Sequence, residues 1–263
     1  MKKALKATAL SIIGSLLLWA ATPVWAAPYQ VEAVSNGGTI SGKVILSGKA
    51  PEPDKILITK NKGVCGDGYR EIQWVPTDGK GGLQEMVVFL EDVAKGKEWD
   101  AKAFDKPTVD QKECFFTPWM QLVRKKDSLT VKNSDPVLHN IHIREIIGIK
   151  LGKPKGVLRT MVNEAQPGEK GALAKDLDVK VNPRRSNYIR INCEAHNFMY
   201  SWMFAAENPY VAKTGKDGSY SLENVPAGKY KLVSWHPTLG IQEQPIEVKA
   251  GGKAQQDFTY KAQ

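Results

Sequence analysis

The sequence is poor in the residues from which many catalytic and metal sites are built. Its 263 residues include only three cysteines and four histidines, and aromatic residues make up 8%. It has no phosphate-binding glycine loop, no pair of CxxC zinc motifs and no serine–histidine–acid order. Nor does it have a basic stretch interleaved with aromatic residues, so we expect no nucleic-acid binding. These absences direct the search to the few cysteines and histidines.

Long apolar runs are also lacking, apart from one at the N-terminus. Three lysines precede an apolar stretch over residues 7–19, and Val24 and Ala26 occupy the −3 and −1 positions of a cleavage site. This layout is typical of a secretory signal peptide cleaved after Ala26. The stretch is short for a membrane span, which needs about 20 apolar residues. We therefore expect a protein of the periplasm or the exterior, without a stable membrane span. Loss of the three lysines changes the net charge from +9 to +6 (9 − 3).

Helical periodicity is scarce, and short alternating runs between Gly and Pro residues take its place. Weak helical character is confined to residues 94–104 and 171–177. Alternation of apolar and polar residues is typical of strands with one buried face. Such runs lie at 39–46, 86–90, 128–132, 188–192, 219–222, 230–235 and 244–248. The pattern predicts an all-β fold, a sandwich or barrel.

The composition changes near residue 206. Beyond it, Asp217-Gly218 indicates a tight turn between strands, and Pro226-Ala227-Gly228 a second turn. Residues 207–263 resemble the carboxypeptidase-regulatory-like, transthyretin-like β module through the pattern D-G-x-Y-x-L followed by V-P-x-G-x-Y-x-L. Because this segment is short for a complete module, residues 27–79, with their early strand, are expected to complete it.

One stretch gathers three groups that bind soft metals. Residues 193–199 contain Cys193, His196 and Met199 with the spacing C-x2-H-x2-M. A trigonal site of two histidines and one cysteine with a weak axial methionine is the ligand set of blue copper. The second imidazole is expected from His139, which follows Asn133-Ser134-Asp135-Pro136 and begins an apolar run.

These two stretches resemble the cupredoxins, in particular plastocyanin and amicyanin. The resemblance implies a Greek-key β-sandwich over residues 80–206 that holds one copper ion through His139, Cys193, His196 and Met199. Asn140 matches the family's asparagine whose side chain ties the two ligand loops together. The sequence departs from the family at Asn197, where such loops have proline, and at Glu194, an acid beside the cysteine.

The resemblance also implies that electrons leave through the exposed edge of His196, with Phe198, Trp202 and Trp119 as candidates for an apolar ring around it. His142 is kept as an alternative ligand, although a regular strand points it away from His139. His236 is interpreted as structural.

If Cys193 binds metal, Cys65 and Cys114 are left to form a disulfide, as an oxidising compartment favours. Three cysteines allow three single pairings, so this pairing is a hypothesis.

The leading functional hypothesis is an exported type 1 copper protein that carries single electrons and is not an enzyme. Its partner would be a redox protein such as a c-type cytochrome or a periplasmic dehydrogenase or oxidase. The basic run Arg124-Lys125-Lys126 would suit an acidic docking surface on that partner. The alternatives are a copper-binding chaperone that holds Cu(I), and a metal-free β-sandwich that binds or scaffolds other proteins.

Overall fold

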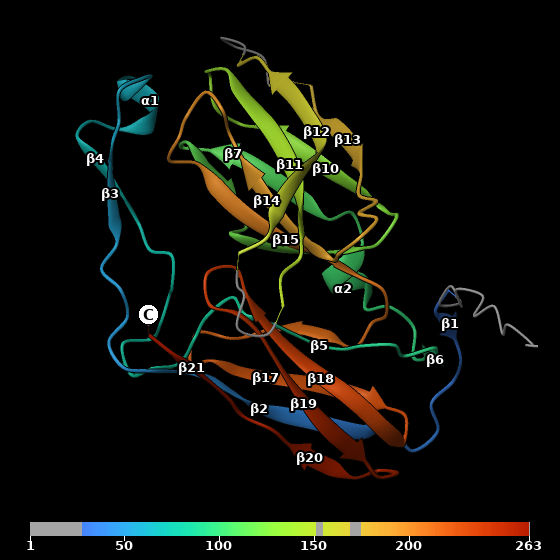
Figure 1. Ribbon diagram of the computed structural model, residues 1–263. Helices are drawn as coiled ribbons and strands as arrows, with labels where there is room; N and C mark the ends of the chain where they lie inside the picture. The colour runs from blue at the N-terminus through green and yellow to red at the C-terminus, as the bar shows by residue number, and fades with distance from the viewer. Residues whose placement is uncertain (1–27, 151–154, 169–174, 263) are drawn as a thin grey trace, which may run out of the picture.

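The computed structural model describes residues 28–150, 155–168 and 175–262 of the chain. Strands form nearly all of its regular structure, and Figure 1 shows two β-sandwiches, one above the other. The predicted all-β fold is therefore confirmed. The expected signal peptide, residues 1–26, lies outside the described residues. Across those residues, no helix has the length and apolar character that a membrane crossing requires.

The upper sandwich consists of two facing sheets. The five-stranded sheet has the order β12-β11-β14-β15-β9 and the four-stranded sheet the order β13-β10-β7-β8. The first contains β9 (Met120–Arg124), β11 (His139–Ile147), β12 (Val157–Gln166), β14 (Tyr188–Asn192) and β15 (Tyr200–Ala206). The second contains β7 (Thr108–Lys112), β8 (Phe115–Thr117), β10 (Ser128–Asn133) and β13 (Leu177–Lys180). The chain changes sheet repeatedly, as expected of a Greek-key sandwich.

Alternation along the strands determines which side chains fill this sandwich. Leu129 and Val131 of β10 and Ile189 and Ile191 of β14 are fully buried in one shared core. On β15, Met203 and its neighbours two residues away face the same core. Trp202 and Phe204 belong to a different cluster, because successive strand residues point to opposite faces.

The lower sandwich is built from both ends of the chain. One sheet contains β16 (Val211–Lys213), β5 (Val87–Leu90), β18 (Gly228–His236) and β19 (Gly240–Val248). The other contains β17 (Ser219–Val225), β2 (Gly38–Ser47), β20 (Lys253–Gln255) and β21 (Phe258–Lys261). The early strand β2 thus pairs with β17, β20 and β21. Residues 87–90, which the sequence places in the copper region, instead pair with β16 and β18.

The predicted Asp-Gly turn lies where β16 leads into β17. Gly218 has φ +77°, and a Cβ atom there would lie 2.4 Å from the carbonyl oxygen of Val44. Only glycine satisfies both the positive φ and the close approach of β2. The turn therefore fixes β17 against the N-terminal strand.

An apolar layer joins the two sandwiches. Trp235 of β18 is fully buried, with its ring centroid 4.8 Å from that of Tyr188 and 6.2 Å from that of Phe204. Trp202 and Phe89 belong to the same cluster. Two minor elements complete this region: α2 (Ala101–Phe104), and the short parallel pair β1 (Gln30–Val31) and β6 (Lys95–Gly96).

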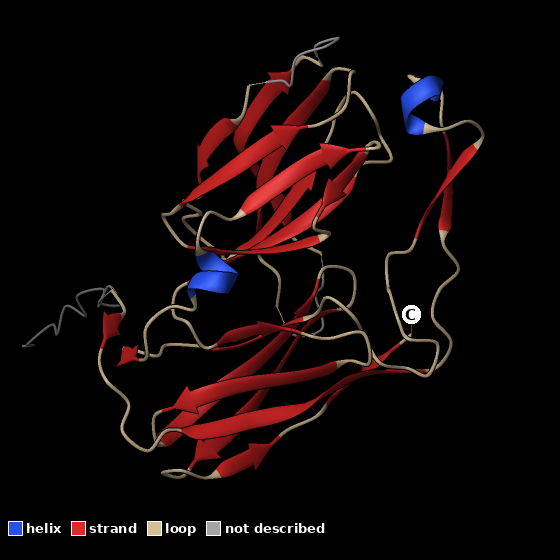
Figure 2. Ribbon diagram, turned by 180° about the vertical axis from the view of Figure 1, so that it is seen from behind, coloured by secondary structure: helices blue, strands red, loops and turns tan. Residues whose placement is uncertain are grey.

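A long hairpin leaves the lower sandwich and runs beside the upper one (Figure 2). We call residues 53–73 the arm; it contains β3 (Asp54–Leu57), α1 (Lys62–Cys65) and β4 (Tyr69–Ile72). Ile56, Ile58, Val64 and Ile72 of the arm pack against the core of the upper sandwich. The tip of the arm, with α1, consequently lies against one end of that sandwich.

Candidate metal centre

Three of the expected ligands meet at one end of the five-stranded sheet, where its inner strands begin or end. His139 begins β11, Cys193 directly follows β14, and His196 lies in the loop before β15. Because β11 and β14 are antiparallel neighbours, with His142 opposite Asn192, the start of one strand lies beside the end of the other. The donor atoms of the three residues lie within 4.8 Å of one another, and all three residues are buried.

The distances between the donor atoms fit a single metal ion. The two histidine Nδ1 atoms are 3.1 Å apart, and Cys193 Sγ is 3.7 Å from Nδ1 of His196 and 4.0 Å from Nδ1 of His139. Metal bonds of about 2.0 Å to nitrogen and about 2.3 Å to sulfur predict edges of about 3.5 Å and about 3.7 Å in a trigonal plane. The triangle of donors therefore has nearly the size that one ion requires.

The far nitrogen of each ring has its own hydrogen-bond acceptor. Nε2 of His139 lies 2.8 Å from a carboxylate oxygen of Asp135, and Nε2 of His196 lies 2.9 Å from Oδ1 of Asn61. Burial lowers the pKa of His139, although Asp135 offsets part of the effect. Burial, His139 and Lys60 lower the pKa of His196 to about 4. Both rings are therefore neutral near pH 7, each with its hydrogen on Nε2.

Two bare ring nitrogens consequently face each other across 3.1 Å. Neither neutral ring has a hydrogen to share at Nδ1, so their lone pairs repel unless a cation lies between them. Cys193 Sγ adds a third donor to the same space. An imidazole whose other nitrogen donates to a carboxylate or carbonyl is typical of a metal ligand. The residues present thus fit a bound soft cation.

Asp135 connects His139 to the turn between β7 and β8. Its carboxylate accepts the backbone N–H groups of Glu113 at 2.7 Å and of Cys114 at 2.8 Å as well as the histidine. Both turn residues have positive φ, +53° and +57°, as in a two-residue hairpin turn. The turn therefore presents two donors to one carboxylate, which holds that carboxylate against the ring. Asp135 lies four residues before His139, but the sequence pattern alone does not indicate this role.

The side chain and backbone of Asn140 link the two ligand segments. Its backbone N–H donates to Cys193 Sγ at 3.4 Å, and its side-chain oxygen accepts the backbone N–H of Glu194. The loop then closes on itself, because Cys193 N–H donates to the carbonyl of Met199 and Met199 N–H to that of His196. Met199 is 1% exposed within the upper core. Its role as axial ligand stays a prediction.

His142 lies outside this cluster. Its Nδ1 is 2.6 Å from a carboxylate oxygen of Glu194, and its Nε2 is 2.8 Å from the hydroxyl of Thr160. Hydrogen bonds from Asn192 and His142, aided by Arg144, lower the pKa of Glu194 to about 2. The acid beside the cysteine thus has its partners on the outer face of the sheet. His236 is fully buried in the lower sandwich, where burial lowers its pKa to about 3.

The expected aromatic ring around His196 is only partly present. Phe198 has its ring centroid 5.7 Å from that of His196. Trp202 belongs instead to the layer between the sandwiches, and Trp119 packs against that layer, 6.2 Å from the ring of His236. The expectation fails for Trp202 because it lies on the face of β15 that points away from the centre.

Instead of an exposed edge, His196 has the tip of the arm above it. His196 is only 2% exposed, whereas Asn61, which accepts its Nε2–H, is an exposed residue with φ +52° just before α1. Asn61 and His196 are 135 residues apart in the chain. The sequence does not indicate a role for Asn61, because no local pattern connects the arm with the loop that contains His196.

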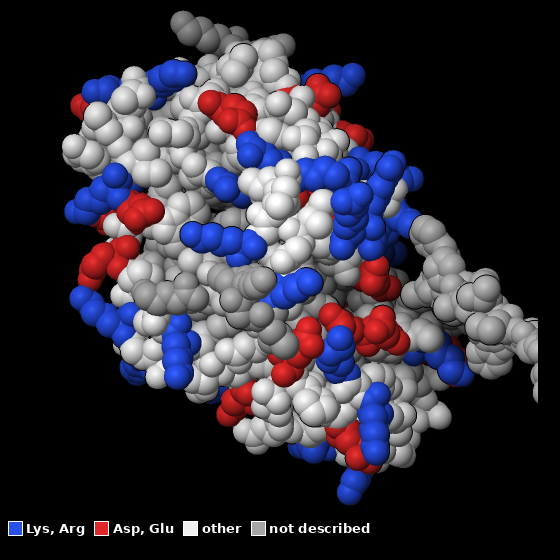
Figure 3. Space-filling model, viewed as in Figure 1, with Lys and Arg blue, Asp and Glu red and all other residues white. Residues whose placement is uncertain are grey.

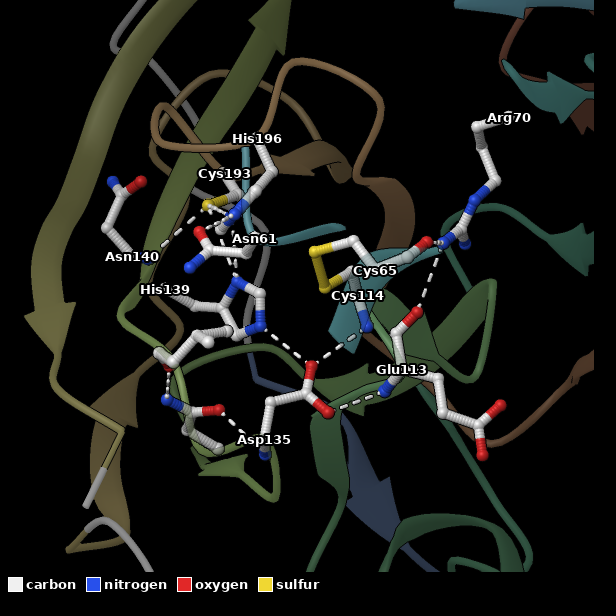
Figure 4. The surroundings of a disulfide bond; sticks show 12 residues. Asn61, Cys65, Arg70, Glu113, Cys114, Asp135, His139, Asn140, Cys193 and His196 are labelled. Atoms are coloured by element: carbon white, nitrogen blue, oxygen red, sulfur yellow. Dashed lines mark hydrogen bonds and ion pairs between the residues drawn. A yellow bond between two sulfur atoms is a disulfide. The ribbon is translucent and has the colours of Figure 1, made fainter. Parts of the chain in front are cut away.

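A disulfide fastens the tip of the arm beside the centre. Cys65 of α1 is bonded to Cys114, so the pairing is the one expected from the sequence, and Cys193 is free and buried. Arg70 of β4 donates to the carbonyls of Cys65 and Glu113, across the same junction. Figure 4 shows that the disulfide, Asp135, Asn61, His139 and His196 form one continuous group.

The basic run at residues 124–126 lies far from this group. Arg124 ends β9 and is opposite Ala206 at the end of β15, whereas the centre lies beyond the start of β15 at Tyr200. Six residues of strand separate the two ends, roughly 20 Å. Lys125 pairs with Glu207 there. Figure 3 shows basic side chains spread over the upper sandwich, with acidic ones between them.

Comparisons with solved structures give several copper proteins. A reduced Cu(I) form of an amicyanin mutant is 17% identical, covers 39% of this chain and 83% of its own, and has a TM-score of 0.27. A purple cupredoxin from Nitrosopumilus maritimus is 14% identical, and the match covers 38% of this chain and 98% of the cupredoxin, with a TM-score of 0.27. A copper-containing nitrite reductase from Thermus scotoductus is 12% identical, and the match covers 39% of this chain and 23% of the reductase, with a TM-score of 0.28. No curated protein matches the chain.

A family model described as polysaccharide lyase family 4, domain II, matches residues 198–256. The interpretation of the C-terminal segment as a transthyretin-like module is therefore wrong, although its β-sandwich character is confirmed. The motif that suggested it encodes two tight turns between short strands, a feature that many small β-sandwiches have in common.

Proposed function

We propose that the chain holds one copper ion in a type 1 site and carries single electrons outside the cytoplasm. The observation that supports this most strongly is the pair of bare Nδ1 atoms, 3.1 Å apart, that face each other beside the thiol of Cys193. Two imidazoles and one thiolate in a trigonal arrangement, with a methionine near by in sequence, are the donors that copper prefers. Zinc is disfavoured because its structural sites are tetrahedral with four strong donors.

Bound copper would supply a one-electron couple. The residues around it serve to keep the donors in one arrangement in both oxidation states. Asp135 and Asn61 fix the rings through their Nε2–H groups, and Asn140 donates its backbone N–H to the sulfur. The buried core around Cys193 keeps water away. A closed site of this kind suits electron transfer and leaves no position for a substrate, so we propose a carrier and not an enzyme.

We infer that electrons leave through His196 and Asn61. The ring of His196 is buried, but its Nε2–H points at the exposed Asn61. Exposed Lys60 and Lys62 flank that residue on the arm tip, and an acidic patch on a redox partner would complement them. A c-type cytochrome or an exported dehydrogenase or oxidase fits this description. The docking surface proposed here replaces the run at 124–126, which lies at the opposite end of the sandwich.

The test is the absorption and spin-resonance spectrum of the copper-loaded, oxidised protein. We expect intense visible absorption from charge transfer between the Cys193 thiolate and Cu(II), and its complete loss in Cys193→Ala. The matched control is His142→Gln, which changes a histidine outside the donor triangle and should leave the spectrum unchanged. A colourless wild-type protein with stoichiometric Cu(II) would contradict the proposal. Tight Cu(I) binding with very weak Cu(II) binding would indicate a copper chaperone instead.

A further inference from the structure

The disulfide lies unusually close to a ligand of the proposed centre. The sulfur atoms of Cys65 and Cys114 and one ring nitrogen of His196 all lie within 4.8 Å of one another. The potential ligand atoms of Cys114, Asp135 and His139 likewise lie within 4.8 Å of one another. Two potential thiolates thus adjoin both histidines of the centre (Figure 4).

The centre itself is closed to ions from solution. His139 is fully buried, and Cys193 and His196 are each 2% exposed. The tip of the arm covers the centre, and its residues 59–63 before Cys65 and 66–67 after it are exposed. Cys65, itself 3% exposed, lies under this part of the surface and, with Cys114, beside His196.

We propose that Cys65 and Cys114 form a loading site: when their disulfide is reduced, the two thiolates and His196 bind one Cu(I) ion and transfer it to the centre. This inference rests on the proposed function. Cu(I) is a soft ion for which thiolate and imidazole are suitable donors. In the disulfide form the two sulfurs are poor donors, because the thiolate is the metal ligand.

The redox step balances with a dithiol reductant. The reductant gives two electrons and two protons, the Cys65–Cys114 bond breaks, and the reductant becomes a disulfide. Binding of Cu(I) then displaces the two thiol protons. On transfer, the Cys193 thiol loses its proton while the loading pair regains two. Reverse exchange with an oxidised dithiol protein closes the disulfide again.

The transfer needs little movement of the protein. His196 belongs to both donor groups, so the two sites are adjacent and the ion moves only between neighbouring sulfur ligands. Cys114, a ligand of the loading site, also adjoins His139, so this site borders both histidines of the centre. The disulfide form would then act as the closed state, with copper inside and Asn61 over His196.

The site is tested in Cys193→Ser, where the centre lacks its thiolate. Competition with a chromophoric Cu(I) chelator should show one Cu(I) per chain after dithiol reduction, bound at least tenfold more tightly than with the disulfide intact. A further His196→Ala change should reduce this affinity at least tenfold. The matched control His142→Ala, at a histidine outside both donor groups, should not reduce it. Equal affinity of the reduced and disulfide forms, or equal loss in both histidine variants, would overturn the proposal.

Two further measurements do not depend on new variants that could misfold. X-ray absorption of reduced Cys193→Ser with Cu(I) should show two sulfur donors and one nitrogen donor; a site with only nitrogen and oxygen donors refutes the assignment. Apo wild-type protein should take up Cu(I) at least tenfold faster with the pair reduced, and equal rates refute the loading role. The visible spectrum of the oxidised, copper-loaded wild type still decides the electron-carrier function by itself.

Discussion

At the scale of single residues, the feature that defines the centre is that the two ring nitrogens of each histidine have different partners. Nδ1 of each ring faces the donor triangle, and Nε2 has a separate acceptor, Asp135 for one ring and Asn61 for the other. The ring orientations therefore depend on residues outside the donor triangle. Those residues come from outside the ligand motif itself.

The first prediction concerns Asp135→Asn. An amide cannot accept the N–H groups of Glu113 and Cys114 and that of His139 as a carboxylate does, so the ring should lose its fixed orientation. We expect copper affinity to fall about 10–100-fold, the usual effect of removing such a partner. Titration with a competing chelator measures this. Ser134→Ala is the control, since its exposed hydroxyl binds Asp110. Equal affinities of the two variants would contradict the assignment.

The sequence predicts which cysteine and histidines meet at the centre, but not the residues that support them. Cys193 and His196 lie within one short motif, and His139 is recognised from its own neighbours, so local patterns suffice. Asn61 reaches His196 across 135 residues through the arm, a contact that no local periodicity encodes. Asp135 lies close to His139 in sequence, but its role depends on a turn that brings Glu113 and Cys114 to it.

At the scale of elements, alternation and turn residues predict strands well but not their partners. The runs at 188–192 and 128–132 form β14 and β10 with the expected faces buried. The segment 86–90 also forms a strand, but it joins the lower sandwich, because pairing depends on long-range contacts. The expected helix near 94–104 is reduced to the single turn of α2. No local pattern in residues 53–73 predicts the arm, because its hairpin is stabilised by contacts with the core of the upper sandwich.

The second prediction tests how β17 is joined to β2. Gly218→Ala should lower the free energy of unfolding by about 1–3 kcal/mol, because alanine is strained at positive φ, and its Cβ would also approach Val44 too closely. Chemical denaturation measures the loss. Gly215→Ala in the same turn is the control, as its nearest neighbour to an added Cβ, the Asp217 carboxylate, is 3.5 Å away. A similar loss in both variants would show that the conformation of Gly218 is not responsible.

At the scale of the whole molecule, the two sandwiches are connected by the layer around Trp235, by the arm and by the disulfide. The layer buries aromatic side chains from both sandwiches, among them Tyr188 and Phe204 from above. The arm adds a covalent link, Cys65–Cys114, between its tip and the upper sandwich. We therefore expect the sandwiches to unfold together.

The third prediction follows from this coupling. Trp235→Ala should lower stability by about 3–5 kcal/mol, the usual cost of removing a buried aromatic side chain. It should also split the single calorimetric transition of the wild type into two, since the shared layer is lost. Phe258→Ala, in the core of the lower sandwich alone, is the comparison and should keep one transition. Two separate transitions in the wild type would show that the layer does not couple the sandwiches.

The interleaved order of the strands also has a consequence for synthesis. Every strand of the upper sandwich has been synthesised once residue 206 is made, whereas β2 must wait for β17, β20 and β21 near the end of the chain. The upper sandwich can therefore fold during translation while β2 and β5 are still unpaired. Over that interval the nascent chain exposes two apolar strand edges, the period in which it most needs a holding chaperone.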